Sequence, residues 1–484
     1  MGKYLYGFSA IGLQDFIFLT NALREIIGAS ELIKKIDVLG QDLQKFLKEK
    51  GINISKNPKE VILSNAGNFR AIFENEADAQ IVIKYLPKLI AKQSYGLQIA
   101  QAVVKIQGDN YKSANATLES HLKIARNKIT FPLDFSHSIL KHNPKTALPL
   151  ATKDNDKSTL QKLQAFDKFN KEHPNSINEL AQLKNAKNKI ALLYADGNAL
   201  GAIVRNLEKD EMKDFSRKLD KATKDAFKNA YESTRQNLAN KDSFKIREVI
   251  CGGDDLVVVC NADIALDFAK NFLAHFENET QDIYKSNNLT ACAGIAFFNH
   301  KYPIHYALKL AKDLCARAKS DSKIINAKNP PSSIMFHNIQ SSAVRSFSAF
   351  VENELTLGAN QMDLKPVRLD FGAYFLRQIN ESAPTIENLL HLVAIFRDKD
   401  APTSRLRQWL SILESNRNLA DNELQQIAKI YADFGEQNLA KFQALHKDLC
   451  LENLVIQKDG IEKTPIYDII SIISNTQSTQ GRAK

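Results

Sequence analysis

Hydrophobic and polar positions along the first 106 residues predict a definite order of strands and helices. Residues 3–11 alternate and are rich in aromatic side chains, which is typical of a strand. Apolar residues at helical spacing between Gln14 and Lys35 predict a helix that Gly28 ends or bends. The pattern then predicts a helix over 38–50, a strand over 61–67, a turn at 65–68, a strand over 69–73, a helix over 76–93 and a strand over 95–106.

The same order is predicted again further along the chain. The expected elements are a strand over 189–197, helices within 199–238, a hairpin over 244–260, a helix over 264–281, a strand over 289–298 and a helix over 306–320. Two copies of one βαα-hairpin-αβ pattern indicate an internal duplication. The mixture of βα units and hairpins predicts the α+β class, with helices packed on one face of each sheet.

The rest of the chain has a different pattern. Residues 131–188 are polar and contain four prolines, which predicts helical segments joined by loops, and the composition near 141–158 favours disorder. After Pro330 and Pro331 amphipathic helices are expected over 383–397, 403–417 and 421–434, followed by a disordered tail from Asn475. We therefore predict four parts: 1–130, a linker over 131–188, 189–340, and a helical domain over 341–484.

Composition narrows the class of protein. Lysine and arginine exceed acidic residues by 65 to 55, a net charge of +10 that suits a phosphate-containing partner. The lysine-rich stretches carry no interleaved aromatic residues, so solvated helix faces explain them better than a single-strand reader does. The apolar runs are far shorter than the ~20 residues of a membrane span. The five cysteines form no CxxC pair and no signal peptide is evident, so we expect a cytoplasmic protein without a disulfide framework.

The strongest chemical signal is the sequence CGGDD at 251–255, between two apolar strands. Glycines permit the backbone angles of a tight turn and let phosphates approach the main chain. Asp and Gly are ordinary turn residues, so the motif alone is more often a simple turn than an active site. Asp196 changes this balance because it ends the upstream apolar strand and is followed at once by Gly197.

Together Asp196, Asp254 and Asp255 predict an oxygen-only site for Mg²⁺ or Mn²⁺, with triphosphate oxygens completing the coordination shell. Lys319 lies on the helix after the last strand of the second copy, where it could meet a triphosphate. The alternative for Lys319 is a solvated lysine among its basic neighbours, and Lys323 is a weaker second candidate.

These motifs resemble the palm domain of polymerases, GGDEF cyclases and class III nucleotide cyclases. The segments 12–33, 194–204, 251–255 and 330–342 narrow the likeness, because they resemble the two palms of the large polymerase-like subunit of type III CRISPR effector complexes. The resemblance covers roughly residues 1–340 and predicts two ferredoxin-like palms followed by a helical domain.

The resemblance implies a nucleotidyltransferase of antiviral defence that converts ATP into a cyclic oligoadenylate. Asp196, Asp254 and Asp255 would then be catalytic and bind two metal ions. The implied nucleotide-binding residues are Gly197, Asn198, Gly252, Gly253 and Lys319, with Ser30 on the acceptor side. The hairpin of the first palm reads NAGNF at 65–69 and has no acids, so this palm is expected to be degenerate.

The sequence departs from the family in ways that leave alternatives open. No HD dipeptide and no cysteine-rich zinc module are present, which argues against DNA cleavage, and Asn198 stands where many relatives carry an acid. Partners could be guide or target RNA and other effector subunits, or the protein could act alone as a homo-oligomer. A non-catalytic nucleotide-binding or RNA-binding scaffold is the alternative function. Among the histidines, His300 and His305 suit structural roles, whereas His337 could line the nucleotide pocket.

Overall fold

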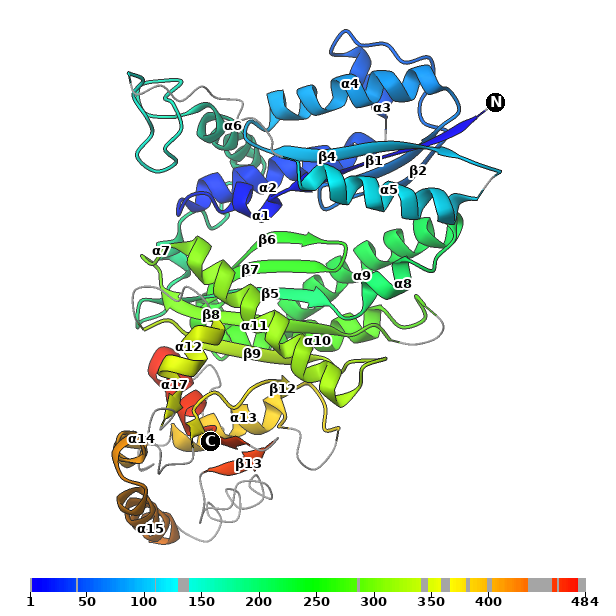
Figure 1. Cartoon of the computed structure of the whole chain (residues 1–484). Coiled ribbons are helices and arrows are strands. Elements are labelled where there is room, and N and C mark those ends of the chain that lie inside the picture. Colours follow the sequence, from blue (N-terminus) through cyan, green and yellow to red (C-terminus); the bar gives the residue numbers. More distant parts are fainter. Residues whose placement is uncertain are drawn as a thin grey trace.

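A computed structural model describes most of the chain and arranges it as a stack that follows chain order from the N-terminus downward (Figure 1). The described residues are 2–40, 42–108, 110–128, 139–284, 288–340, 347–357, 366–379, 384–397, 403–433, 455–458 and 461–477. We call residues 3–126 the N-terminal unit and residues 189–338 the central unit. Each of these units is built on its own β-sheet.

The N-terminal unit is an antiparallel sheet in the order β2-β3-β1-β4. This is the strand order of a ferredoxin-like fold, as predicted. Its elements are β1 (Lys3–Ile11), α1 (Leu13–Ile17), α2 (Leu23–Asp37), η1 (Val38–Gly40), α3 (Leu43–Lys48), β2 (Glu60–Asn65), β3 (Asn68–Phe73), α4 (Glu76–Gln93), β4 (Gln98–Ile106) and α5 (Tyr111–Arg126).

The central unit repeats this order as β6-β7-β5-β8 and extends it with β9 and β12. Strand β9 pairs in parallel with β8, so the segment around 330–342, which carried no strand prediction, completes the sheet. The elements are β5 (Lys189–Gly197), α8 (Leu200–Val204), α9 (Lys209–Gln236), η2 (Lys241–Ser243), β6 (Ile246–Gly252), β7 (Asp255–Asn261), η3 (Ala262–Ile264), α10 (Ala265–Glu279), β8 (Ala291–Asn299), α11 (Ile304–Ile325) and β9 (Ser333–Asn338).

Helices cover both faces of each sheet, so the prediction of one covered face was wrong. In β1, Phe8 packs in the core beneath α2 and α4, whereas a Cβ on Gly7 would lie 2.8 Å from Leu118 of α5. In β5, Leu193 belongs to the core under α9 and α10, and Leu192 to the core under α11. The uninterrupted apolar run of β5 is the cause, because a strand buried on both sides does not alternate.

The helix expected over residues 14–35 is two helices, and Gly28 neither ends nor bends the second. It lies inside α2, where a Cβ would stand only 1.8 Å from the carbonyl oxygen of Lys162 on α6 (Lys157–Glu172). The glycine therefore permits close contact of two helices. Lys162 is itself buried and donates from Nζ to the carbonyl of Phe16 at 2.5 Å, which ties α6 to α1 as well.

The segment at 141–158 is ordered, contrary to the prediction. Its backbone forms bridges between His142 and Pro149 and between Leu150 and Asp156. The carboxylate of Asp156 is 1% exposed and accepts hydrogen bonds from Asn143, Thr146 and Thr159. Hydrogen bonds among buried polar side chains thus order this segment, which has few apolar residues to form a core of its own. The linker ends with α7 (Leu180–Leu183).

The C-terminal part is mainly helical, as expected, but it also contains strands that the pattern did not reveal. The helices are α12 (Phe347–Glu354), α13 (Ile386–Phe396), α14 (Thr403–Ser415), α15 (Arg417–Asp433) and α17 (Ile466–Asn475). The strands are β10 (Thr356–Leu357), β11 (Val367–Arg368), β12 (Tyr374–Phe375), β13 (Ile456–Lys458) and β14 (Ile461–Lys463). Strands of two or three residues are too short to show alternation. Of the predicted disordered tail, residues 478–484 lie outside the described residues.

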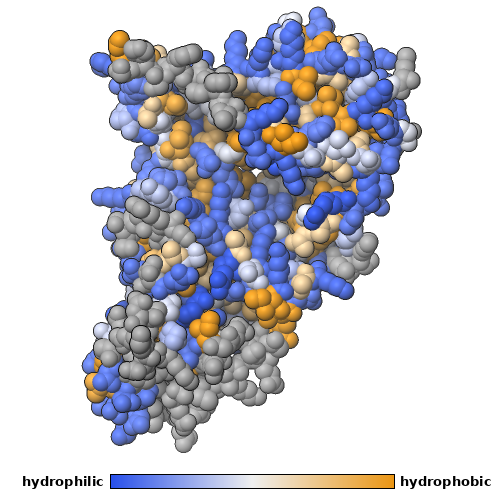
Figure 2. All heavy atoms as spheres, in the orientation of Figure 1, coloured by the Kyte–Doolittle hydropathy of each residue, from blue (hydrophilic) through white to orange (hydrophobic). Residues whose placement is uncertain are grey.

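The surface agrees with the composition. The face shown in Figure 2 is largely hydrophilic, with hydrophobic side chains in scattered groups. No described helix is both long enough and apolar enough to cross a bilayer. The four cysteines within the described ranges are free thiols.

Candidate active site

The GGDD sequence forms the predicted hairpin between β6 and β7. Gly252 pairs with Asp255, which leaves Gly253 and Asp254 as a two-residue turn. The φ angle of Gly253 is +63°, a left-handed conformation that strains any residue with a side chain. Glycine at the first turn position is the requirement of a type II′ hairpin turn. The turn thus places Asp254 at the tip and Asp255 at the start of a buried strand.

Helix α9 holds this turn through hydrogen bonds to both the carbonyl and the amide of Gly253. Thr223 donates from Oγ1 to the carbonyl of Gly253 at 2.6 Å, and the amide of Gly253 donates to Oδ1 of Asp220 at 3.1 Å. A Cβ on Gly252 would lie 3.3 Å from the same Asp220 oxygen. These contacts could not be predicted from the sequence, since both α9 residues precede the motif by about one helix length.

Asp196 comes to the turn from the neighbouring strand, as predicted. β5 lies between β7 and β8, and Asp196 is its penultimate residue. A Cβ on Gly197 would lie 3.1 Å from the Cβ of Asp254. Burial, together with the charges of Asp255 and Asp196, raises the pKa of Asp254 to about 8. The hairpin and the strand end therefore bring three carboxylates together.

Asp255 has a hydroxyl group and an ammonium group as polar neighbours. Burial and the charge of Asp196 raise its pKa to about 6, against the opposing effect of a hydrogen bond from Tyr194. Tyr194 donates from its hydroxyl to Oδ1 at 3.1 Å. Lys312 on α11 is electrostatically coupled to Asp255 and also to Asp15 of α1, and burial lowers the pKa of Lys312. No sequence motif pointed to Lys312, which the structure places within electrostatic reach of these acids.

Lys319 lies beside the carboxylates, and its predicted contact with a triphosphate stays a prediction. Its Nζ donates to Oδ2 of Asp196 at 2.5 Å and to the carbonyl of Gly197 at 2.7 Å. Both partners of the ion pair are partly exposed, with 19% and 30% of the side-chain surface accessible for Lys319 and Asp196. Lys319 thus neutralises part of the charge that three carboxylates concentrate, and it stays within reach of a ligand.

The donor set suits a divalent cation, although a metal site is not ready-made. Burial and mutual repulsion raise the pKa of Asp254, and the three carboxylates are the hard oxygen ligands that Mg²⁺ and Mn²⁺ prefer. Across the described ranges, however, no three acidic, histidine or cysteine side chains already have the spacing of a metal site. One carboxylate oxygen of Asp196, Oδ2, is already bonded to Lys319. The metal assignment of Asp196, Asp254 and Asp255 stays a prediction.

The other predicted residues are placed less favourably. Asn198 is 5% exposed and its Nδ2 donates to Thr290 and to the carbonyl of Pro330, so the side chain anchors a loop. His337 is buried beside Phe350 and burial lowers its pKa to about 4, which is a packing role rather than a pocket role. Lys323 is exposed in the last turn of α11.

Ser30 lies at the boundary between the two units. Its hydroxyl donates to the carbonyl of Val249 on β6 at 2.6 Å, and the side chain is 8% exposed. Ser30 also lines a cavity of about 440 Å³ that both units enclose, with Gly252 on the opposite wall. The position fits the predicted acceptor side, but the hydroxyl hydrogen is already used.

The matching hairpin of the N-terminal unit has a different turn and no acid of its own. Ala66 and Gly67 have φ angles of 48° and 72°, two successive left-handed residues of the kind that a type I′ turn needs. The amide of Gly67 donates to Oδ1 of Asp37 on α2 at 2.9 Å. Burial raises the pKa of Asp37 to about 6. One carboxylate in place of three agrees with the prediction of a degenerate first palm.

Two cavities lie between the units, and neither is lined by Asp196, Asp254 or Asp255 themselves. The cavity of about 440 Å³ reaches Gly252, and it also receives Asp37 and the ion pair of Lys224 with Asp220. A second cavity, of about 430 Å³, lies between α1 and α11 and is lined by Lys312, the neighbour of Asp255. A third cavity, of about 610 Å³, is distant from the acids, because all its lining residues come from the N-terminal unit and α6.

Comparison with known proteins supports the likeness in the central unit. Residues 189–327 match the family described as Cas10/Cmr2, second palm domain. Two crystal structures of a Csm1–Csm4 cassette, in complex with cA3 and with cA4, superpose on 98% of this chain and 70% of the solved chain. Their TM-scores are 0.58 and 0.56 at 14% identity, which is a likeness of fold.

The extent of these matches varies. Against the cassette in complex with pppApA, the alignment covers 66% of this chain and 53% of the solved chain, with 16% identity and a TM-score of 0.45. This chain therefore spans about half the length of that relative. No curated protein matches the chain in sequence.

Proposed function

From the match of residues 189–327 to the Cas10/Cmr2 second palm domain, we propose that the protein is a nucleotidyltransferase that converts ATP into a cyclic oligonucleotide. The observation that carries the proposal is the meeting of Asp196, Asp254 and Asp255 at one end of the central sheet, with Lys319 beside them. A cluster of carboxylates raises the free energy of the fold, so its presence indicates a cationic ligand.

The proposed reaction is a phosphoryl transfer. A ribose hydroxyl oxygen forms a bond to the α-phosphorus of ATP, the bond to pyrophosphate breaks, and the hydroxyl loses its proton. The same step would repeat to lengthen the chain. In the last step the terminal ribose hydroxyl of the chain would attack the α-phosphorus at its other end, which closes the ring and releases a final pyrophosphate. Two divalent cations bound by the carboxylates would supply the Lewis acidity that lowers the pKa of the hydroxyl and neutralises the leaving group.

Residues of this chain would bind the phosphates and position the two nucleotides. Lys319 would exchange Asp196 for a phosphate oxygen, and the absence of side chains at Gly252 and Gly253 would let phosphates approach the turn. The two cavities between the units would hold the donor and the acceptor nucleotide, with Ser30 on the acceptor side. The N-terminal unit would contribute walls without catalytic acids.

The partners follow from the comparisons as a further part of this proposal. The matched cassette contains a second protein, and its structures are described with ATP, AMPPNP, cA3 and cA4. We propose that this protein likewise works with effector-complex subunits, and that a target RNA controls its activity. The division into palms at 1–130 and 189–340, a linker at 131–188 and a C-terminal domain at 341–484 belongs to the same proposal.

The test is mass spectrometry of the products after incubation of the full chain with ATP and Mg²⁺ or Mn²⁺. We expect a cyclic oligonucleotide from the wild type, and a reduction of at least about 100-fold in the variant Asp254→Ala with Asp255→Ala. The control is Asp242→Ala, which removes an exposed acid of η2. Metal-dependent ATP binding without product would indicate a missing activator. Product formation by the double variant would show that Asp254 and Asp255 are not the catalytic acids, and an absence of ATP binding would favour the non-catalytic scaffold.

A further inference from the structure

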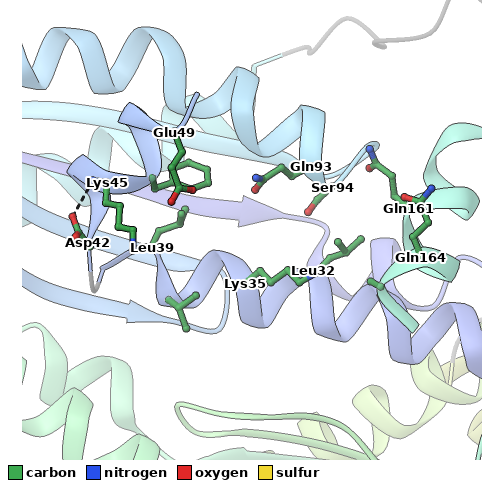
Figure 3. Close-up of a pocket in the computed structure, with 13 residues that line it drawn as sticks. Leu32, Lys35, Leu39, Asp42, Lys45, Glu49, Gln93, Ser94, Gln161 and Gln164 are labelled. Carbon is green, nitrogen blue, oxygen red and sulfur yellow. Dashed lines mark hydrogen bonds between the residues drawn. The ribbon is translucent and has the colours of Figure 1, made fainter. Parts of the chain in front are cut away.

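The cavity of about 610 Å³ lies on the N-terminal unit, away from the GGDD hairpin. We call it the outer pocket. Figure 3 shows that α2 supplies one wall, the end of α4 the opposite wall, and α3 and α6 the two ends. Side chains that line it include Leu32 and Lys35 of α2, Phe46 of α3, Ser94 after α4, and Gln164 of α6. Neither β6 nor β7 contributes to it.

A buried hydroxyl at the wall of the outer pocket indicates that a polar ligand belongs there. Ser94 is 1% exposed, and its Oγ has no hydrogen-bond partner among the described residues. An unpartnered buried hydroxyl lowers the stability of the fold, because it has lost its hydrogen bonds to water without gaining others. In Figure 3 this oxygen points into the space between α4 and α2. A ligand atom in the pocket would supply the missing partner.

The pocket has a surface suited to a flat heterocycle. Leu32, Leu39 and Ala165 form an apolar floor, and the half-buried ring of Phe46 stands at the side. Aromatic rings stack on nucleic-acid bases with useful affinity and little sequence preference. The amides of Gln93 and Gln164 project from the two neighbouring helices, where each offers both a donor and an acceptor to the edge of a base.

The charged side chains at the rim of the outer pocket indicate how much negative charge its ligand can carry. Lys35 and Lys45 contribute two ammonium groups, and neither forms an ion pair with another described residue. Asp42 and Glu49 contribute two carboxylates, of which Asp42 already caps α3 by accepting from the amide of Lys45 at 2.9 Å. A rim without net charge suits one phosphate better than a triphosphate, and Glu49 is available for ribose hydroxyls.

We propose that the outer pocket is a second nucleotide site, which binds a nucleotide unit carrying a single phosphate. Phe46 would stack on the base, Ser94 and Gln93 would bond to its edge, and Lys35 with Lys45 would hold the phosphate. The unit could be a free nucleoside monophosphate or one residue of a phosphodiester-linked oligonucleotide. Both present the same chemistry to the pocket.

Helix α2 connects this site to the carboxylates. Lys35 and Leu32 face the outer pocket, whereas Ser30 and Asp37 of the same helix line the cavity shared with the central unit. Val38, which follows α2, lines both cavities. Helix α2 thus forms a wall of both the outer pocket and the inter-unit cavity.

The experiment is titration calorimetry of the full chain with AMP and, separately, with the dinucleoside monophosphate ApA. The variant Lys35→Gln with Lys45→Gln should weaken binding about tenfold or more, because it removes two charge-assisted hydrogen bonds. Ser94→Ala should weaken it several-fold. The control is Lys48→Gln, an exposed lysine of α3 outside the pocket. Hydrogen exchange with ligand present should show protection of residues 42–50 and 93–95.

Each outcome decides the proposal. Binding of AMP alone supports a free mononucleotide as ligand, and stronger binding of ApA supports an oligonucleotide. Absence of binding at millimolar concentrations, equal affinity of the double variant and Lys48→Gln, or protection confined to the inter-unit cavity would overturn it. Repeating the titration in Asp254→Ala with Asp255→Ala separates this site from catalysis, since the outer pocket should bind unchanged even if the proposed synthesis fails.

Discussion

Lys319 neutralises Asp196 with a side chain that comes from a different element, α11, and it also bonds to the carbonyl of Gly197. Replacement by methionine keeps the apolar stem and removes the charge. We expect Lys319→Met to weaken ATP binding about tenfold, since one charge-assisted contact to phosphate is lost. Isothermal titration with ATP and Mg²⁺ measures this.

The matched control for this variant is Lys323→Met, one helical turn further along α11 and exposed. Because Lys323 lies apart from the ion pair, its loss should leave the affinity within about twofold. Equal affinity losses in the two variants would mean that general charge, and not the contact with Asp196, attracts the nucleotide.

The site residues that belong to a motif could be predicted from the sequence. Those that only packing brings near the GGDD turn could not. Asp254 and Asp255 follow from the GGDD turn, and Asp196 from the end of an apolar strand. Thr223 and Asp220 could not be found in this way, because a lone threonine and aspartate within a lysine-rich helix look like any solvated face. Side chains that support a site from another element carry no local signal.

At the scale of elements, the contact between α9 and the hairpin leads to a prediction about activity. Thr223→Val keeps the shape and removes the hydroxyl that bonds to the carbonyl of Gly253. We expect product formation to fall about tenfold, because the turn loses one of its two supports, with little change in melting temperature. The assay is the ATP conversion described above.

Lys221→Ala is the control for Thr223→Val, since Lys221 is exposed on the same helix. A normal rate in Thr223→Val would show that Asp220 and the backbone of the hairpin suffice to hold the turn. A parallel loss in Lys221→Ala would point instead to the stability of α9 as a whole.

The packing of α2 on α6 gives a prediction about stability. A Cβ on Gly28 would lie 1.8 Å from the carbonyl oxygen of Lys162, so the two helices must separate in Gly28→Ala. We expect a loss of about 1–3 kcal/mol in unfolding free energy, or a melting temperature lower by several degrees, in denaturation followed by circular dichroism. Gly201→Ala is the control, because a Cβ there meets nothing within 4 Å, and it should be neutral or slightly stabilising.

Gly28 also shows where sequence patterns fail at this scale. A glycine near the middle of a helical pattern is compatible with an end, a bend or a close contact, and only the partner helix decides among them. Strand β9 escaped notice for a related reason, since it joins the central sheet by pairing with β8 and not through a hairpin of its own. The long apolar strands and the two hairpins, by contrast, were predicted correctly because their signals are local.

For the whole molecule, the attachment of the C-terminal part predicts a pH dependence. Asp468 of α17 is buried and accepts from the hydroxyl of Tyr374 at 2.8 Å and from the amide of Phe371 at 3.3 Å. Burial raises its pKa from 3.8 to about 8. The folded chain therefore holds a proton that the unfolded chain releases, and the contribution of this group to stability falls as the pH rises from about 4 to about 8.

Asp468→Asn removes this titration and keeps an acceptor for Tyr374. We expect the variant to lose less melting temperature than the wild type between mildly acidic and mildly alkaline buffer, with a slope difference of at most about 1.4 kcal/mol per pH unit. Differential scanning calorimetry at several pH values tests it. Identical pH profiles of the two proteins would show that other groups control the alkaline loss of stability.

Helix α9 gives the stack of units a mechanical property. With 28 residues it is a rod of about 42 Å, and near its start Lys209 and Lys213 hold Glu60 of the N-terminal unit at 2.7 and 3.2 Å. Further along the same helix, Thr223 and Asp220 hold the GGDD turn. A continuous helix that contacts both the N-terminal unit and the turn moves as one body, so a displacement at one contact reaches the other. Any partner that tilts the N-terminal unit would therefore move the turn with it, so the two halves of the protein cannot be tuned independently.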